Sequence, residues 1–255
     1  VQESMLPNYR YVGMNNNSIN ITMRKAISYA INYSDLVEYV TEGRGIQVRS
    51  PIPAGCLYSN TTAFDLPEYN ITHARKLLKD AGWPGTATLN ANDNVSAGNE
   101  WEMLVINDTP LETYNFSYFD NPLHLRHAVV LPEYLKQIGI KLEKDHNSSF
   151  NSQIFIFGWV LDYNDPHNAL YSTFDYYNFM ELNDSLIEEW MNDGIKETNT
   201  TIREQIYYNI QERIIEVLYP VAWTCSPFKY EIHVSNLKAF QPNPYKTVLK
   251  NAYFV

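Results

Sequence analysis

The segment that most constrains the fold is residues 153–160, a short run that is nearly continuously apolar. A strand without polar alternation is typical of one buried on both faces of a sheet. Each face of such a sheet must be covered by another layer, and helices are the usual cover. The segment therefore predicts a sheet flanked by helices.

Strand-like and amphipathic helical segments alternate along the rest of the chain. The further strands are predicted at 9–14, 140–143, 219–225 and 230–234, and the helices at 23–31, 35–41, 73–81, 123–138, 185–197 and 201–218. Alternation of this kind predicts an α/β architecture with a mixed sheet. Residues 90–121 are polar and irregular, apart from a strand-like island at 103–106. At 255 residues the chain fits one large domain, 1–255.

Capping chemistry assigns the helix starts. Ser34 and Thr72 precede two predicted helices, and Thr201 with Glu204 matches a capping box. Helical periodicity places the basic residues Arg75, Lys76 and Lys79 on a solvated face rather than in a binding patch.

Charge and hydropathy exclude several classes of protein. The net charge is −10 and the basic residues are scattered singly, so nucleic acid is not a predicted partner. No apolar run is long enough to span a membrane, and the first residues lack the pattern of a signal peptide. The aromatic content of 14% suits a ligand surface and a core of large side chains equally well.

The asparagines indicate an exported, glycosylated protein. The pattern Asn-x-Ser/Thr occurs at Asn16, Asn20, Asn32, Asn60, Asn70, Asn94, Asn107, Asn115, Asn147, Asn183 and Asn199. Random placement would give roughly three such sites. The alternative is that asparagine-rich composition and helix caps produce the pattern by accident, as at Asn70 and Asn199. Cys56 and Cys225 allow one disulfide in an oxidising compartment, or two buried apolar thiols.

Catalytic and metal motifs are not apparent. No nucleophile elbow, glycine-rich phosphate loop or Cys-x-x-Cys pair occurs, and no cofactor is expected. His124 and His127 could share a helix face, but two histidines without a third ligand do not make a zinc site. The carboxylates around Trp190 are typical of a solvated acidic face.

The stretch 158–168 is the best candidate for a binding site. A buried strand runs through Gly158 and Trp159 directly into the acid, aromatic and amide groups at Asp162, Tyr163 and Asn164. Strand ends of α/β sheets are where ligands bind, and a carboxylate beside a tryptophan can hold an ammonium group. The alternative is a turn that satisfies only its own backbone.

Several motifs together resemble those of family 5 extracellular solute-binding proteins, the dipeptide and oligopeptide receptors of ABC importers. Residues 23–36 read MRKAISYAINYSDL, 50–55 SPIPAG, 73–83 HARKLLKDAGW and 135–140 LKQIGI, followed by the motif at 158–166. The match covers most of the chain in the family's order and is weakest at 90–121 and 139–158.

The resemblance implies a type II periplasmic-binding-protein-like lobe. A full member has two lobes that close on the ligand, so this chain would be the C-terminal lobe, with hinge segments near 9–14 and 219–227 and the N-terminal lobe absent. In peptide-binding members the acid matching Asp162 holds the peptide ammonium, and the residue matching Trp159 lines the pocket; Tyr163 and Gly158 belong to the same motif. The partners implied are a peptide or similar small solute and an ABC transporter permease.

The resemblance also implies an extracellular location, at a cell surface through a membrane anchor or in a periplasm, and the composition is typical of archaeal surface proteins. Two other functions remain open. One is a sugar-binding transport receptor, because the acidic motif also occurs in such members. The other is a glycosylated surface protein that reuses the fold for adhesion or assembly. An enzyme is not predicted, since no nucleophile has a recognisable base beside it.

Overall fold

The computed structural model describes residues 2–5, 8–145, 152–231, 237–238 and 253–254. Its centre is a five-stranded mixed sheet in the order β5-β4-β6-β2-β7. The strands are β2 (Asn8–Met14), β4 (Glu112–Ser117), β5 (Ile140–Lys144), β6 (Ile154–Val160) and β7 (Val221–Trp223). β4 runs parallel to β5 and β6, whereas β2 runs antiparallel to β6 and β7. The predicted mixed sheet is confirmed.

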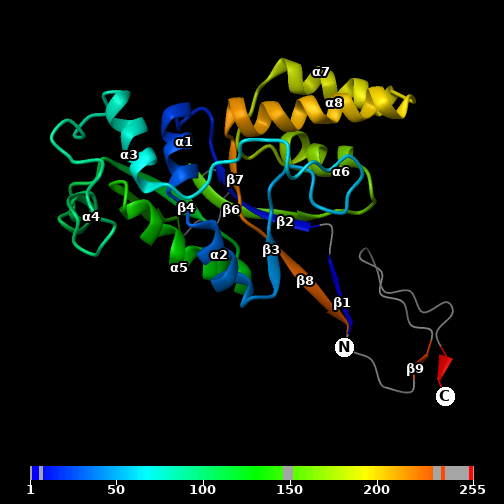
Figure 1. Cartoon of the computed structure of the whole chain (residues 1–255), viewed down its shortest axis with the longest axis horizontal. Coiled ribbons are helices and arrows are strands. Elements are labelled where there is room, and N and C mark those ends of the chain that lie inside the picture. The colour runs from blue at the N-terminus through cyan, green and yellow to red at the C-terminus, as the bar shows by residue number, and fades with distance from the viewer. Residues whose placement is uncertain (1, 6–7, 146–151, 232–236, 239–252, 255) are drawn as a thin grey trace.

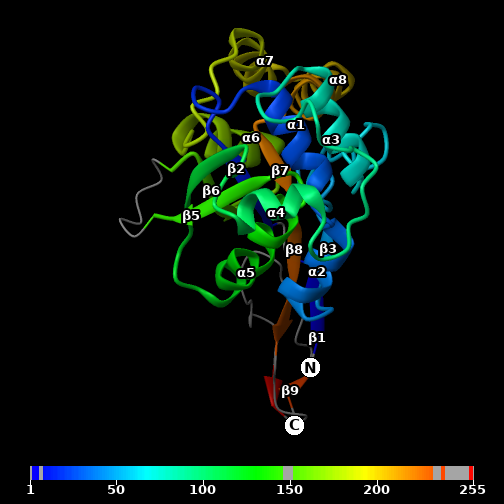
Figure 2. The same cartoon turned by 90° about the vertical axis from the view of Figure 1, so that its left-hand side faces the viewer.

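Helices cover both faces of this sheet (Figures 1 and 2). On one face lie α1 (Ile21–Ala30), α2 (Tyr33–Thr41), α3 (Ile71–Asp80), α4 (Glu100–Ile106) and α5 (Pro122–Lys136). On the other lie α6 (Pro166–Tyr171), the π-helical turn η1 (Ser172–Tyr176), α7 (Ser185–Lys196), α8 (Thr200–Glu212) and a second π-helical stretch, η2 (Arg213–Leu218). None of the helices in the described residues is long and apolar enough to cross a membrane.

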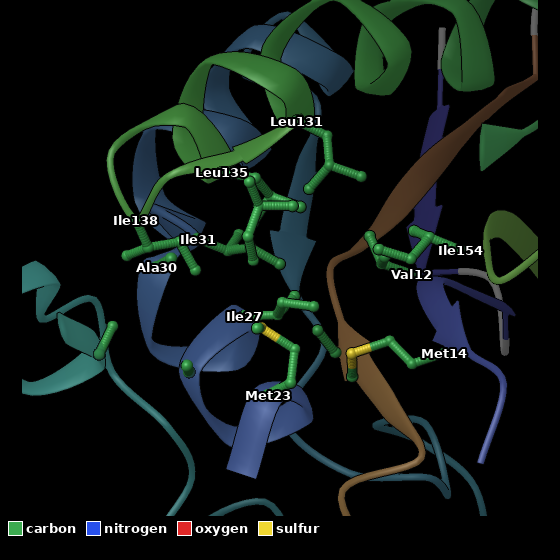
Figure 3. Close-up of a cluster of buried hydrophobic side chains, with 14 of the residues drawn as sticks. Val12, Met14, Met23, Ile27, Ala30, Ile31, Leu131, Leu135, Ile138 and Ile154 are labelled. Carbon is green, nitrogen blue, oxygen red and sulfur yellow. The ribbon is translucent and has the colours of Figure 1, made fainter. Parts of the chain in front are cut away.

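The side chains of β2 alternate between two cores. Val12 and Met14 point into the core under α1 and α5, where Figure 3 shows them facing Ile154 and the helix residues. Tyr9 and Tyr11 point into the core under α6, α7 and α8. Burial of both faces is why β6, which pairs with β2, is apolar along nearly its whole length.

Two strands extend beyond the helices. β1 (Gln2–Met5) pairs antiparallel with β8 (Cys225–Glu231), which also pairs with β3 (Gly45–Gln47), and Figure 1 shows β1 and β8 projecting away from the helical layers. Two further short strands, β9 (Leu237–Lys238) and β10 (Tyr253–Phe254), pair with each other. Of the predicted hinge segments, 9–14 lies within β2 and 219–227 passes through β7 into β8; their hinge role stays a prediction. Of the predicted strand 230–234, residues 232–234 lie outside the described residues.

Three predicted helix caps were wrong in the same way. Asn32 caps α2 in place of Ser34, Asn70 caps α3 in place of Thr72, and Asn199 caps α8 in place of the predicted Thr201. In each helix the asparagine side-chain oxygen accepts a backbone N–H of the first turn, and the Ser/Thr lies two residues later. Asparagine caps as well as serine does, so pattern alone could not choose between them.

Local pattern was also misleading around residues 90–121. Residues 103–106, predicted as a strand, belong to helix α4, and strand β4 was missed.

Arg75, predicted to be solvated, is fully buried. The predicted helix 201–218 changes from α-helical to π-helical hydrogen bonding at Arg213.

The predicted disulfide is absent from the structure: Cys56 and Cys225 are free, buried thiols. Cys225 belongs to the core beneath α1 and α5, and Cys56 to the core beneath α6–α8. The two cores lie on opposite faces of the sheet, which keeps the two residues apart. The alternative prediction, two separate buried apolar thiols, is therefore the one that describes both cysteines.

Candidate functional site

The candidate site lies at one end of the strands of the central sheet. The parallel strands β4 and β6 both end there, and the antiparallel β2 begins there, since Asn8 pairs with Val160. The loop 161–165 follows β6 at this end of the strands. Ligands of open α/β sheets bind outside the carboxyl ends of the strands, so this end of the sheet is a candidate binding site on topology alone.

The two acids of this loop have different environments. Asp165 caps α6 and forms an ion pair with Arg203, with 2.9 Å between Oδ2 and Nη2. Asp162 is exposed, and no described residue is recorded as a partner of its carboxylate. Its backbone N–H instead donates to Oδ1 of Asn168, at 2.9 Å. Asp165 therefore fixes the loop, which leaves the Asp162 carboxylate available to a ligand.

The other residues of the predicted motif flank Asp162. Trp159 is half-buried and its indole Nε1 has no partner among the described residues, while Tyr163 is 52% exposed. Gly158 has a packing role, because an added Cβ would lie 2.2 Å from the backbone oxygen of Tyr9 and 2.5 Å from Cδ of Arg10. The structure thus places these predicted site residues together, but the ligand contacts assigned to them stay predictions.

A row of rings leads from the loop to a cavity. We call it the aromatic row; it consists of Trp159, Tyr177, Tyr176, Tyr171 and His167. Successive ring centroids are 5.2, 4.5, 6.1 and 5.5 Å apart. Such spacing brings each ring into contact with the next. Trp159 and His167 belong to the stretch 158–168 that the sequence analysis singled out, whereas Tyr171, Tyr176 and Tyr177 were missed, although the clustering of tyrosines after α6 was a signal.

The row ends at an acidic cavity of about 420 Å³ between α6, η1 and α7. Its walls include Tyr171, Met191 and three carboxylates, those of Asp175, Asp184 and Glu188, and no lysine or arginine is among the described side chains that line it. The imidazole of His167 also lines it, and burial lowers the pKa of that ring. Arg213 holds Asp184 in an ion pair through both carboxylate oxygens, which lowers the pKa of Asp184 and compensates its charge, so the acidic character of the lining comes from Asp175 and Glu188. The cavity therefore favours ligands with positive charge and apolar surface.

His124 and His127 do not form a metal site. In His127, Nδ1 bonds the Leu123 carbonyl oxygen and Nε2 the Thr224 hydroxyl, at 2.8 and 3.0 Å, and burial lowers its pKa to about 4. Burial and then the charge of Arg10 lower the pKa of His124 to about 3. The described residues contain no group of three or more side chains suited to hold a metal ion.

The asparagines of the glycosylation pattern lie at or near the surface. Asn147 falls outside the described residues, and none of the other ten is buried. Four of them, Asn20, Asn32, Asn70 and Asn199, cap helices through Oδ1, which does not engage the Nδ2 atom to which a glycan attaches. The caps support the alternative explanation at those four positions, and glycosylation itself stays a prediction.

Comparison with known proteins identifies the family. The model of bacterial extracellular solute-binding proteins, family 5 Middle, matches residues 1–181. Heme-binding protein A of Haemophilus influenzae is 25% identical over 221 residues, which are 80% of this chain and 37% of that protein. HbpA2 of Haemophilus parasuis has a TM-score of 0.79 at 20% identity, over 100% of this chain and 49% of that one.

The oligopeptide-binding protein AppA of Bacillus subtilis, solved with a nonapeptide, has a TM-score of 0.74 at 18% identity, over 100% of this chain and 52% of that one. The chain thus spans about half the length of these structures and less than two fifths of the heme-binding relative. The likeness to these structures shows that the chain has the type II periplasmic-binding-protein fold. The chain belongs to the family 5 extracellular solute-binding proteins, a family of binding proteins and not of enzymes.

Proposed function

We propose that this chain is the ligand-binding lobe of an extracellular receptor that captures peptides for an ABC importer. A second lobe would close over the strand ends at Asp162 and enclose the peptide. The loaded receptor would then be presented to the permease. The observation that carries the proposal is the exposed carboxylate of Asp162 just after β6, which has no partner among the residues that the structure describes.

The surroundings of Asp162 support an ammonium ligand. The carboxylate would accept charge-assisted hydrogen bonds from the α-ammonium group of a peptide. The aromatic row offers apolar faces beside it, and the described lining of the acidic cavity holds carboxylates but no lysine or arginine. A titration of short peptides with free and with acetylated N-termini tests this directly.

We expect Asp162→Asn to weaken the binding of free peptides by tenfold or more, because a hydrogen bond to a charged group contributes about 1.5–3 kcal/mol. Calorimetry or NMR titration of the longest available form of the protein measures this. Acetylation of the peptide N-terminus should reproduce the loss in the unsubstituted protein. Asp80→Asn, which removes an exposed carboxylate from α3, is the matched control and should leave the affinity unchanged.

Equal binding of free and acetylated peptides would remove the role assigned to Asp162. If no peptide bound at all, the sugar-receptor and adhesion alternatives would take precedence. An adhesion protein would show no saturable binding of small solutes, and Asp162→Asn would then change only its stability.

A further inference from the structure

The cavity between α6, η1 and α7 is distinct from the loop that carries Asp162. Of the aromatic row, Tyr171 and His167 line the cavity, whereas Trp159 does not, and neither does Asp162. The helices around it lie on the face of the sheet opposite α5 (Figure 1), while Asp162 lies at the strand ends. The cavity can therefore hold a ligand of its own.

The inner wall of the cavity is apolar and consists of the buried side chains of Phe174, Leu182, Ile187 and Met191. Ile187 and Met191 lie one turn apart on α7, and Ile195 continues this stripe to the rim, where it is 54% exposed. An apolar stripe on a helix normally packs against another element. Here it borders a space of about 420 Å³, which lies in the range of pockets for small organic molecules.

Hydrogen bonds hold the rest of the wall in place. The Asn178 side chain donates to the backbone oxygen of Leu182 at 2.7 Å and accepts its backbone N–H at 2.9 Å. Asp184 caps α7 and is held in turn by Arg213 through both carboxylate oxygens. Because these bonds form within the protein, a ligand does not have to order this wall when it binds.

Two carboxylates, those of Asp175 and Glu188, determine which charge the cavity accepts; we call them the rim carboxylates. Both residues are exposed, and no described residue is recorded as a partner of either carboxylate. His167 does not repel a cation, since burial lowers the pKa of its ring and leaves it neutral at neutral pH. The described residues contain no group of three or more side chains suited to a metal ion, so an organic cation fits the rim carboxylates better than a metal does.

We propose that this cavity is a second binding site, which takes a small organic amine, an ammonium group on an apolar stem. The stem would lie against the inner wall, and the ammonium group would bind the rim carboxylates. The ring of Tyr171 offers a face that also attracts a cation. The inference goes beyond the proposed function and does not depend on it, because the cavity would bind the amine whether or not a peptide is held at Asp162.

Titration of the full chain with phenethylamine tests the inference, and phenethyl alcohol is the uncharged control of nearly the same size. NMR of isotope-labelled methionine methyl groups locates the binding, because Met191 belongs to the inner wall. We expect phenethylamine to shift the Met191 signal saturably and to bind about fivefold more tightly than the alcohol. The signals of Met14 and Met23, in the core on the other face of the sheet, should stay in place.

Asp175→Asn and Glu188→Gln should each weaken the binding of phenethylamine, and the double variant should reduce its affinity to that of phenethyl alcohol. Glu189→Gln, at an exposed position of α7 outside the cavity wall, is the matched control and should leave the affinity unchanged. The shift of the Met191 signal should persist in Asp162→Asn, because the two sites are separate. Each substituted residue is exposed, so the variants should fold as the unsubstituted protein does.

Several results would overturn the inference. One is a Met191 signal that phenethylamine does not shift up to its solubility limit. Another is equal binding of the amine and the alcohol, which would leave the rim carboxylates without a role. Displacement of the amine by a peptide bound at Asp162 would make the cavity part of the capture site. If no peptide binds but the amine shifts the Met191 signal, the receptor proposal fails and the amine site stands.

Discussion

The guanidinium of Arg75 lies beneath α3 and joins three segments that follow it in the chain. It donates to the backbone oxygens of Gln137 and Asp93, at 2.8 and 2.6 Å, and to Oδ1 of Asn99 at 3.1 Å. It also lies 5.3 Å from the ring centroid of the buried Trp101. These bonds organise residues 90–101, a stretch with little regular structure of its own.

Replacing Arg75 with Met should destabilise the protein by about 2–4 kcal/mol, because the apolar side chain leaves buried acceptors without donors. Denaturant unfolding followed by circular dichroism measures the change. Lys76→Met, at the neighbouring exposed position, is the control and should stay within about 0.5 kcal/mol of the unsubstituted protein. A loss as small as the control's would show that water replaces the three bonds.

At the scale of single residues, the sequence predicted Asp162 and Trp159 as site residues through a motif, and the structure shows why the buried Arg75 escaped notice. Arg75 is a charged residue next to Lys76, so it was assigned to the solvent although its neighbours Ala74 and Leu78 are buried. Its partners, two backbone oxygens and the Asn99 side chain, lie further along the chain, and composition gives no sign of them.

Among the elements, α7 and α8 pack most closely at Gly194. A Cβ added there would lie 2.9 Å from Cζ and 3.0 Å from the hydroxyl oxygen of Tyr207, whose side chain is fully buried. The glycine is thus a point of close approach between the two helices. It lies in the last turns of α7, where alanine would ordinarily be the better residue.

We expect Gly194→Ala to destabilise the protein despite the improved helix propensity. Propensity would add up to about 1 kcal/mol, whereas overpacking against an immobile ring costs about 1–3 kcal/mol. Thermal unfolding should therefore show a lower melting temperature for Gly194→Ala and none of that loss for Glu189→Ala, an exposed position of the same helix. A higher melting temperature would mean that Tyr207 can move aside.

The elements themselves were largely predictable, and their ends were not. Amphipathic periodicity located α1, α3, α5, α7 and α8, but the caps depended on choosing between Asn and a Ser/Thr two residues later. β4 lies where the sequence is polar, and its pattern of burial follows from its place between β5 and β6. That neighbourhood is a property of the whole sheet, which a local window does not contain.

For the whole molecule, the paired histidines of α5 set a dependence of stability on pH. Their folded-state pKa values of about 3 for His124 and 4 for His127 lie below the ordinary value of 6.5. The unfolded chain therefore binds more protons below pH 6.5, and stability falls as the pH drops from about 6.5 towards 4. Each histidine contributes up to about 1.4 kcal/mol per pH unit.

His127→Gln should reduce the loss of stability between pH 7 and pH 5 by about 1–2 kcal/mol relative to the unsubstituted protein. Denaturant unfolding at the two pH values provides the comparison, and His73→Gln, at an exposed position of α3, should leave the loss unchanged. The same loss in all three proteins would mean that His127 is already protonated, or already accessible to water, in the native state.

The β1–β8 ladder has a mechanical consequence. The strands run antiparallel from the outer pair Gln2 and Glu231 to the inner pair Met5 and Phe228, so both outer ends face the same way. Tension applied across those ends would separate the paired residues one pair at a time from the outer end, instead of shearing all the pairs at once. The chain would resist stretching only weakly until the tear reached Met5 and Phe228, where the load would pass to the pairing of β8 with β3 and to β2 of the five-stranded sheet.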